Sequence, residues 1–270
     1  MKLEPKRRRQ NLLVGDGLVQ LSNSLRVGFD CDCLQRFVRR ILEECLEETC
    51  VDRYSGRTDT ISCILGFGIK ETGGLLLGEE RQRGRQRNLA VIDFFPGEER
   101  EGMAIREKCE VALTYDLMQL CVSKYIPQKF SSENVKIVGW YHSHPREVML
   151  DEMSTVDKET QRSYQAMYEN AVCLIVRVEL LGRAWLKAIT HSYVLVDEIR
   201  RAVRFYQISR RNDAIPIEWD FEREGVSLSP QTRVHPSWFA SRSNGRRIGQ
   251  VSSPAQGGES QFGHLSLDSS

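Results

Sequence analysis

Apolar side chains recur at three- and four-residue spacing over residues 33–48, with charged residues between them. That spacing gives a helix one apolar face, so the pattern predicts an amphipathic helix that covers a sheet. Two shorter apolar runs follow at 74–80 and 88–95, and the polar segment between them centres on Gly84. Because a glycine suits a tight turn, these runs are expected to pair as a β-hairpin.

The rest of the patterned region predicts three helices and three strands. The helices are expected at about 106–125, 155–169 and 198–207, with Pro127 stopping the first. The strands are expected at about 135–141, 171–178 and 184–196. A hairpin excludes a wholly parallel sheet, so the order predicts one mixed α/β (α+β) domain with a central mixed sheet flanked by helices.

Composition divides the chain into four parts. Residues 1–24 are polar with a basic cluster at 6–9, which is typical of a flexible basic tail. The patterned domain is expected over 25–210, with a C-terminal extension over 211–224. Residues 225–270 are rich in serine, glycine, proline, glutamine and arginine, so a disordered C-terminal tail is expected.

Charge and hydropathy exclude several classes of protein. The 270 residues include 38 Lys+Arg and 37 Asp+Glu, a net charge of +1, which argues against binding to nucleic acid. No run approaches the ~20 apolar residues that cross a bilayer, and no apolar segment of a signal peptide follows the basic start. We therefore expect an intracellular protein, cytoplasmic or nuclear, that does not enter a membrane.

The eight cysteines contain no CxxC pair, and several lie inside apolar patterns. They are expected to be reduced thiols that pack as small hydrophobes and have no part in a metal site. A zinc knuckle is the alternative for the four at positions 31, 33, 45 and 50, but their spacing fits no common site.

The informative pair is His142 and His144, at the end of a predicted strand. Residues i and i+2 of a strand point to one side, so both imidazoles can converge on one metal ion. Ser154 and Asp157 are three apart at the start of a predicted helix and share a face. Two imidazoles and a carboxylate suit Zn²⁺ and leave a fourth position open, as catalytic zinc sites do.

Spacing alone leaves alternatives open for these residues. Ser154 also suits a helix N-cap, because Ser-x-x-Asp resembles a capping pattern. Asp157 is also favoured in a first helical turn by the helix dipole. Asp151 is a competing third ligand. Trp140 and Tyr141 precede the ligands on a buried type of strand and are expected in the core.

Three motifs occur in order along the chain. Glu71-Thr-Gly-Gly-Leu-Leu-Leu-Gly78 comes first, Gly139-Trp-Tyr-His-Ser-His-Pro145 second, and Ser154-Thr-Val-Asp157 with a following Thr-Gln third. Together they resemble the JAMM, or MPN-plus, metalloproteases, whose known eukaryotic members remove ubiquitin or ubiquitin-like proteins. The resemblance covers about residues 25–207. One departure is the segment between Pro145 and Ser154, which is two residues longer than is usual in the family.

The resemblance implies an MPN/JAMM domain with one catalytic zinc ion held by His142, His144 and Asp157. It implies that Glu71 activates water and carries its proton to the leaving amine, and that Ser154 steadies the oxyanion. The Ser-x-x-Asp-x-x-Thr-Gln frame favours Asp157 over Asp151 as the third ligand. No residue is singled out for substrate binding.

The function that the resemblance implies is a zinc-dependent isopeptidase resembling the catalytic MPN subunits of the proteasome lid and signalosome. Its substrates would be conjugates of ubiquitin or a ubiquitin-like protein, and a second MPN subunit is an expected partner. One alternative is a non-enzymatic MPN scaffold subunit, although scaffolds typically lack the ligand set. Another is a JAMM hydrolase acting on a prokaryotic ubiquitin-like or sulfur-carrier protein.

Overall fold

The computed structural model describes residues 25–47, 71–83, 86–97, 104–106, 111–145, 153–223 and 226–239. Several features that the sequence singles out lie outside these ranges. They are the basic N-terminal segment, Gly84 at the expected turn, Asp151, and the C-terminal residues from 240 onward.

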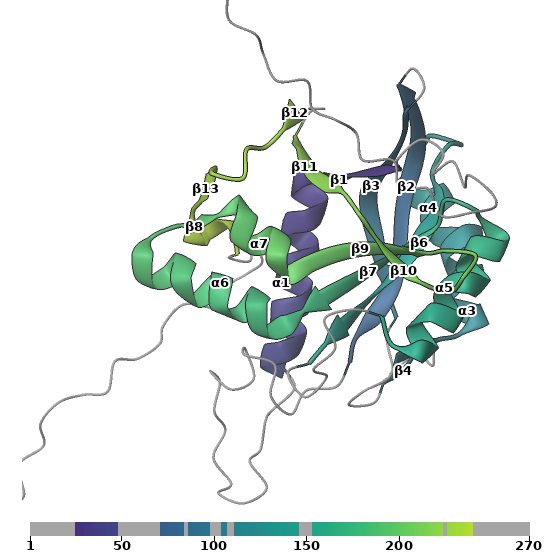
Figure 1. Cartoon of the computed structure of the whole chain (residues 1–270), viewed down its shortest axis with the longest axis horizontal. Helices are drawn as coiled ribbons and strands as arrows, with labels where there is room; N and C mark the ends of the chain where they lie inside the picture. The colour runs from purple at the N-terminus through teal and green to yellow at the C-terminus, as the bar shows by residue number, and fades with distance from the viewer. Residues whose placement is uncertain are drawn as a thin grey trace, which may run out of the picture.

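Within the described ranges, nine strands form one mixed sheet at the centre of the molecule (Figure 1). Their order across the sheet is β10 (Ala214–Ile217), β9 (Val203–Ile208), β7 (Val172–Arg177), β6 (Lys136–His144), β2 (Gly73–Arg83), β3 (Gln86–Pro96), β1 (Arg26–Asp30), β11 (Trp219–Arg223) and β12 (Val226–Ser227). Neighbours are parallel at β6–β7, β1–β3 and β1–β11, and β2 and β3 pair as the expected antiparallel hairpin. Two small sheets are β4 (Ala104–Arg106) with β5 (Val111–Leu113), and β8 (Val194–Leu195) with β13 (Arg233–Val234).

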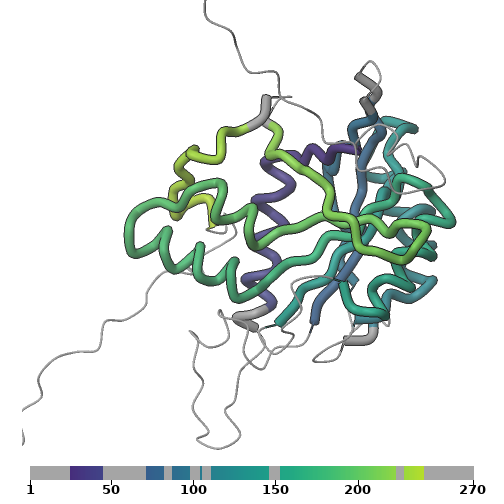
Figure 2. The backbone as a smooth tube through the Cα atoms, in the orientation of Figure 1, coloured from purple at the N-terminus to yellow at the C-terminus, as the bar shows by residue number. Residues whose placement is uncertain are grey.

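Helices cover both faces of this sheet, as the tube in Figure 2 also shows. One face carries α1 (Cys31–Glu47), α6 (Val178–His191) and α7 (Val196–Ala202), with the 3₁₀ turn η3 (Pro236–Trp238) nearby. The other carries α3 (Tyr115–Leu120), the π-helical turn η2 (Cys121–Tyr125), α4 (Ile126–Lys129) and α5 (Thr155–Met167). No described helix is long and apolar enough to cross a bilayer. The mixed fold with a central sheet is confirmed.

Alternation along the central strands explains the two cores. Leu76 belongs to the core beneath α1, whereas its neighbours Leu75 and Leu77 belong to the core beneath α5. On β7, Leu174 and Cys173 divide in the same way. Side chains alternate between the faces of a strand, so a strand buried on both faces reads as a continuous apolar run.

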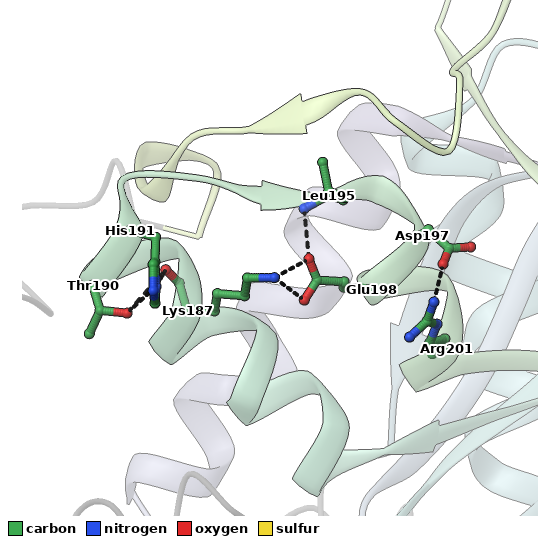
Figure 3. Close-up of polar contacts among 7 residues, drawn as sticks. All are labelled: Lys187, Thr190, His191, Leu195, Asp197, Glu198 and Arg201. Atoms are coloured by element: carbon green, nitrogen blue, oxygen red, sulfur yellow. Dashed lines mark hydrogen bonds and ion pairs between the residues drawn. The ribbon is translucent and has the colours of Figure 1, made fainter.

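Polar contacts hold α6 and α7 together at the margin of the core beneath α1 (Figure 3). The Glu198 carboxylate accepts from Lys187 Nζ at 2.8 Å and from the Leu195 backbone N–H at 3.3 Å. On α7, Arg201 Nη2 donates to Asp197 Oδ2, one turn earlier, at 2.7 Å. Glu198 therefore connects the start of α7 to the middle of α6.

The helix expected over 106–125 is wrong in its first half. Residues 104–106 and 111–113 are the paired strands β4 and β5, and the helix begins only at Tyr115. Pro127 does not stop it. The chain passes through the π-helical turn into α4, where Pro127 occupies the first turn, and a first-turn residue needs no N–H hydrogen bond.

Two further expectations fail near the C-terminal half. The strand expected over 184–196 is mostly α6, because the apolar stripe of that helix begins earlier, at Val178 and Leu181, and continues at three- and four-residue spacing. The helix expected over 198–207 ends at Ala202, and β9 follows with most of its side chains buried. The short apolar runs fitted both periods, and only packing distinguishes them.

The disordered tail expected from residue 225 is wrong for its first part. Residues 226–239 contribute β12, β13 and η3, and the side chains of Val234 and Phe239 are buried in the core beneath α1. The expected extension over 211–224 also supplies two strands of the central sheet. Few apolar residues are enough here, because Val234 and Phe239 pack against a core that other elements also form.

Candidate metal centre

Strand β6 brings the two histidines together at its end. Gly139, three residues before His142, permits the close approach of β7, because a Cβ there would lie 1.9 Å from the Val172 carbonyl oxygen. His142 and His144 point to one side of the strand, and their Nε2 atoms lie 2.9 Å apart. Both side chains are buried. The two imidazoles therefore converge at the end of β6.

Helix α5 supplies the third group through its N-cap. The Ser154 Oγ accepts from the Asp157 N–H at 3.1 Å, and the Asp157 carboxylate accepts from the Ser154 N–H at 2.7 Å. This capping box fixes the Asp157 side chain, whose Oδ1 lies 3.2 Å from His142 Nε2 and whose Oδ2 lies 3.7 Å from His144 Nε2. Capping and metal binding are therefore compatible roles, since the cap aims the carboxylate at the imidazoles.

Burial and hydrogen bonding act in opposite directions on the ionisable groups of this site. Burial lowers the pKa of His142, and the hydrogen bond to Asp157 opposes that shift only in part. Burial alone would raise the pKa of Asp157, but its hydrogen bonds to His142 and His144 outweigh burial and hold that pKa below its usual range. Asp157 is therefore a buried, ionised carboxylate, and burial disfavours the protonated form of its neighbour His142.

This donor set fits a metal ion. The nitrogen and oxygen atoms of His142, His144 and Asp157 all lie within 4.8 Å of one another. Two ligand atoms on a tetrahedral Zn²⁺ ion are roughly 3.3 Å apart, given bonds of about 2.0–2.1 Å. Two neutral imidazole nitrogens as close as these repel each other unless a proton or a cation lies between them. The buried His-His-Asp group could thus bind a metal.

Glu71 lies two residues before β2, the strand that pairs with the strand of the histidines. The backbone and hydroxyl of Ser143 bond to Thr72, with Ser143 N–H donating to Thr72 O at 2.8 Å and Ser143 Oγ accepting from Thr72 N–H at 2.9 Å. The β2–β6 register pairs Gly73 with His142, so two further steps bring Glu71 opposite His144. Opposed residues of an antiparallel pair share a face. Glu71 is 3% exposed and is not one of the three converging groups.

Two buried side chains, Trp140 and Cys173, contact His142, and the sequence does not predict these contacts. The Trp140 indole stacks on the His142 ring, with centroids 4.7 Å apart and planes 10° apart. Cys173, on β7, places its Sγ 3.8 Å from His142 Nδ1. Cys173 thus contacts one residue of the converging group, although it is not one of the three groups itself. The parallel pairing of β6 with β7 creates this contact, and the spacing along one strand does not reveal it.

The other predicted residues divide into two groups. Trp140 and Tyr141 are fully buried, as expected for core positions. Met153, at the end of the lengthened segment, packs in the core beneath α5. Asp151, the alternative third ligand, lies outside the described residues.

Residues 49–170 match the family model described as JAB1/Mov34/MPN/PAD-1 ubiquitin protease. The matched segment includes β2, β6 and the whole of α5, and so all five residues that the motifs singled out. A search of curated proteins found no match to the chain.

Proposed function

Because this chain contains a JAB/MPN domain, we propose that it is a zinc-dependent isopeptidase. Its reaction would be hydrolysis of the bond between the C-terminus of ubiquitin, or of a ubiquitin-like protein, and a lysine amine. The near-zero net charge is compatible with a protein substrate. A partner subunit with its own MPN domain and an intracellular location belong to the same proposal.

The observation that carries the proposal is the buried His-His-Asp group. His142, His144 and Asp157 offer two nitrogens and one oxygen from two different elements, a strand end and a helix start. Three protein ligands with an open fourth position are typical of catalytic zinc, whereas structural zinc sites close all four. A scaffold that only pairs with partners has no need of such a group, which costs stability when it is empty.

The roles of the chain's own residues follow from their chemistry. Zinc, when bound, supplies Lewis-acid chemistry that polarises a carbonyl and makes water more acidic. The Glu71 carboxylate would take the proton from the attacking water and return it to the lysine amine as that amine leaves. The Ser154 hydroxyl oxygen accepts from the Asp157 N–H, so its own proton remains available to donate to the developing oxyanion.

The test combines zinc analysis with cleavage of a panel of ubiquitin dimers. Zinc content comes first, because it does not require a partner subunit. The full chain is compared with Glu71→Gln and His142→Ala, and with Glu133→Gln as a control at an exposed glutamate. We expect about one zinc ion in wild type and in both glutamate variants, and loss of zinc in His142→Ala. Cleavage should fall at least about 100-fold in Glu71→Gln and remain unchanged in Glu133→Gln.

Each result bears on a separate part of the proposal. Wild-type protein without stoichiometric zinc would rule out the metalloenzyme and favour the scaffold. Full activity in Glu71→Gln would remove Glu71 as the general base while leaving the metal centre in place. Zinc-loaded protein that cleaves a prokaryotic ubiquitin-like fusion, and no ubiquitin dimer, would redirect the substrate to that class.

A further inference from the structure

The Nδ1 atom of His142, on the side of the ring away from His144 and Asp157, faces a sulfur atom. His142 Nε2 points toward His144 and Asp157, and Nδ1 points the other way, 3.8 Å from Cys173 Sγ. Both side chains are fully buried. Among the described residues, this thiol is the polar group that contacts His142 Nδ1. Water cannot easily replace it there, because the surroundings are the apolar core beneath α5.

The chemistry of a histidine ligand makes this contact important. A neutral imidazole that binds a metal through Nε2 carries its proton on Nδ1, and that buried N–H needs an acceptor. A thiol sulfur accepts weakly, and its S–H can also turn to donate to a bare Nδ1. Cys173 can therefore stay in contact with His142 whichever nitrogen carries the proton.

The Trp140 ring keeps His142 in this orientation. It lies parallel to the imidazole, and its Nε1–H donates to Gln161 Oε1 at 2.9 Å. Gln161 is itself anchored, because its amide donates to the Ala171 carbonyl oxygen at 2.7 Å. Rotation of the imidazole out of its plane would push against this indole. The ring plane is thus set by packing, and the remaining question is what satisfies Nδ1.

We infer that Cys173 is a positioning residue for His142: its sulfur accepts the Nδ1–H and so directs the Nε2 lone pair toward the metal. The inference rests on the proposed function, since it concerns the same metal centre. It assigns to β7, which carries none of the three converging groups, a part in metal affinity. Residues that support a metal-bound histidine in this way typically contribute about 10- to 100-fold to metal affinity.

The experiment measures zinc affinity of the full chain by competition with a chelator. Cys173→Ala removes the acceptor, and Cys121→Ala is the matched control. Cys121 is equally buried in the same core cluster, so both variants delete the same atoms from the same core. We expect about a tenfold loss of zinc affinity in Cys173→Ala and a change of less than about twofold in Cys121→Ala. Cys173→Ser, with a hydroxyl on a shorter bond, should lie between wild type and Cys173→Ala.

A second measurement separates positioning from general loosening of the core. The Nδ1–H proton of His142 in zinc-loaded protein should give an NMR signal that shifts in Cys173→Ala and stays in place in Cys121→Ala. If Cys173→Ala fails to fold, Cys173→Val fills the space without the acceptor and should show the same loss. Equal zinc affinity in wild type and in the folded Cys173 variant would overturn the inference and leave the proposed function standing. Wild-type protein that binds no zinc would overturn both.

Discussion

Two buried aspartates, Asp157 and Asp93, have partners that differ in kind. Asp157 faces two imidazoles, whose charge depends on pH. Asp93, on β3 and 1% exposed, faces permanent cations, with Lys129 Nζ at 2.6 Å and Arg36 Nη1 at 3.0 Å. The hydroxyl of Tyr125 also donates to Asp93 at 2.8 Å.

The difference in their partners indicates a different role for each carboxylate. A buried charge is tolerated when an opposite charge accompanies it. At Asp93 the chain supplies that charge itself, from α1 on one face and α4 on the other, so the cluster joins the two helical layers. At Asp157 the two partners are imidazoles, and burial disfavours the protonated form of His142, so a bound cation would balance the charge of the carboxylate. The first group is structural, and the second is suited to a ligand.

The strongest test of this contrast compares the zinc affinity of variants at Asp157 and at Asp93. Asp157→Ala should lower zinc affinity by more than about 100-fold, which exceeds the loss expected for a residue that only supports a ligand. Asp93→Asn should retain stoichiometric zinc. Zinc retained by Asp157→Ala but lost by Asp151→Ala would show instead that the lengthened loop supplies the third ligand.

The converse effect should appear in stability. Asp93→Asn should lower the free energy of unfolding by about 2 kcal/mol, measured by denaturant titration of metal-free protein. The figure is below that of a fully buried pair because the side chains of Arg36 and Lys129 are 45% and 38% exposed and can regain water. A change within error would mean that Asp93 does not join the layers.

The two sites should also respond differently to pH. Burial lowers the pKa of His142 below its ordinary 6.5, so the metal-free folded protein takes up fewer protons than the unfolded chain as pH falls through that value. Stability should be complete above about pH 6.5 and decline below it, by at most about 1.4 kcal/mol per pH unit for one group. The decline between pH 7 and 5 should shrink in His142→Ala and persist in Asp93→Asn. A decline of the same size in His142→Ala would assign it to other groups.

The smallest expected effect concerns the hydrogen bond from Tyr125 to Asp93. Tyr125→Phe removes the hydrogen bond to Asp93 but leaves both cations in place, so it should cost about 1 kcal/mol of unfolding free energy. Differential calorimetry of the metal-free protein would measure it. Zinc affinity should not change, and a loss there would mean that the two regions are coupled.

The sequence by itself determined the parts of the site that depend on local geometry. His142 and His144 share a face because they are two residues apart on a strand, and Ser154 and Asp157 meet because they occupy one helical turn. Glu71 came from resemblance alone, since local spacing does not distinguish it among 37 acidic residues.

Only the tertiary structure decided the rest, because those contacts join residues far apart in the chain. Cys173 reaches His142 through the parallel register of β6 and β7, and Arg36 and Lys129 meet at Asp93 from opposite layers. The helical state of 184–191 and the order of 226–239 likewise depend on surfaces that other elements provide. Periodicity records which side of a segment is apolar, whereas packing decides what that side meets.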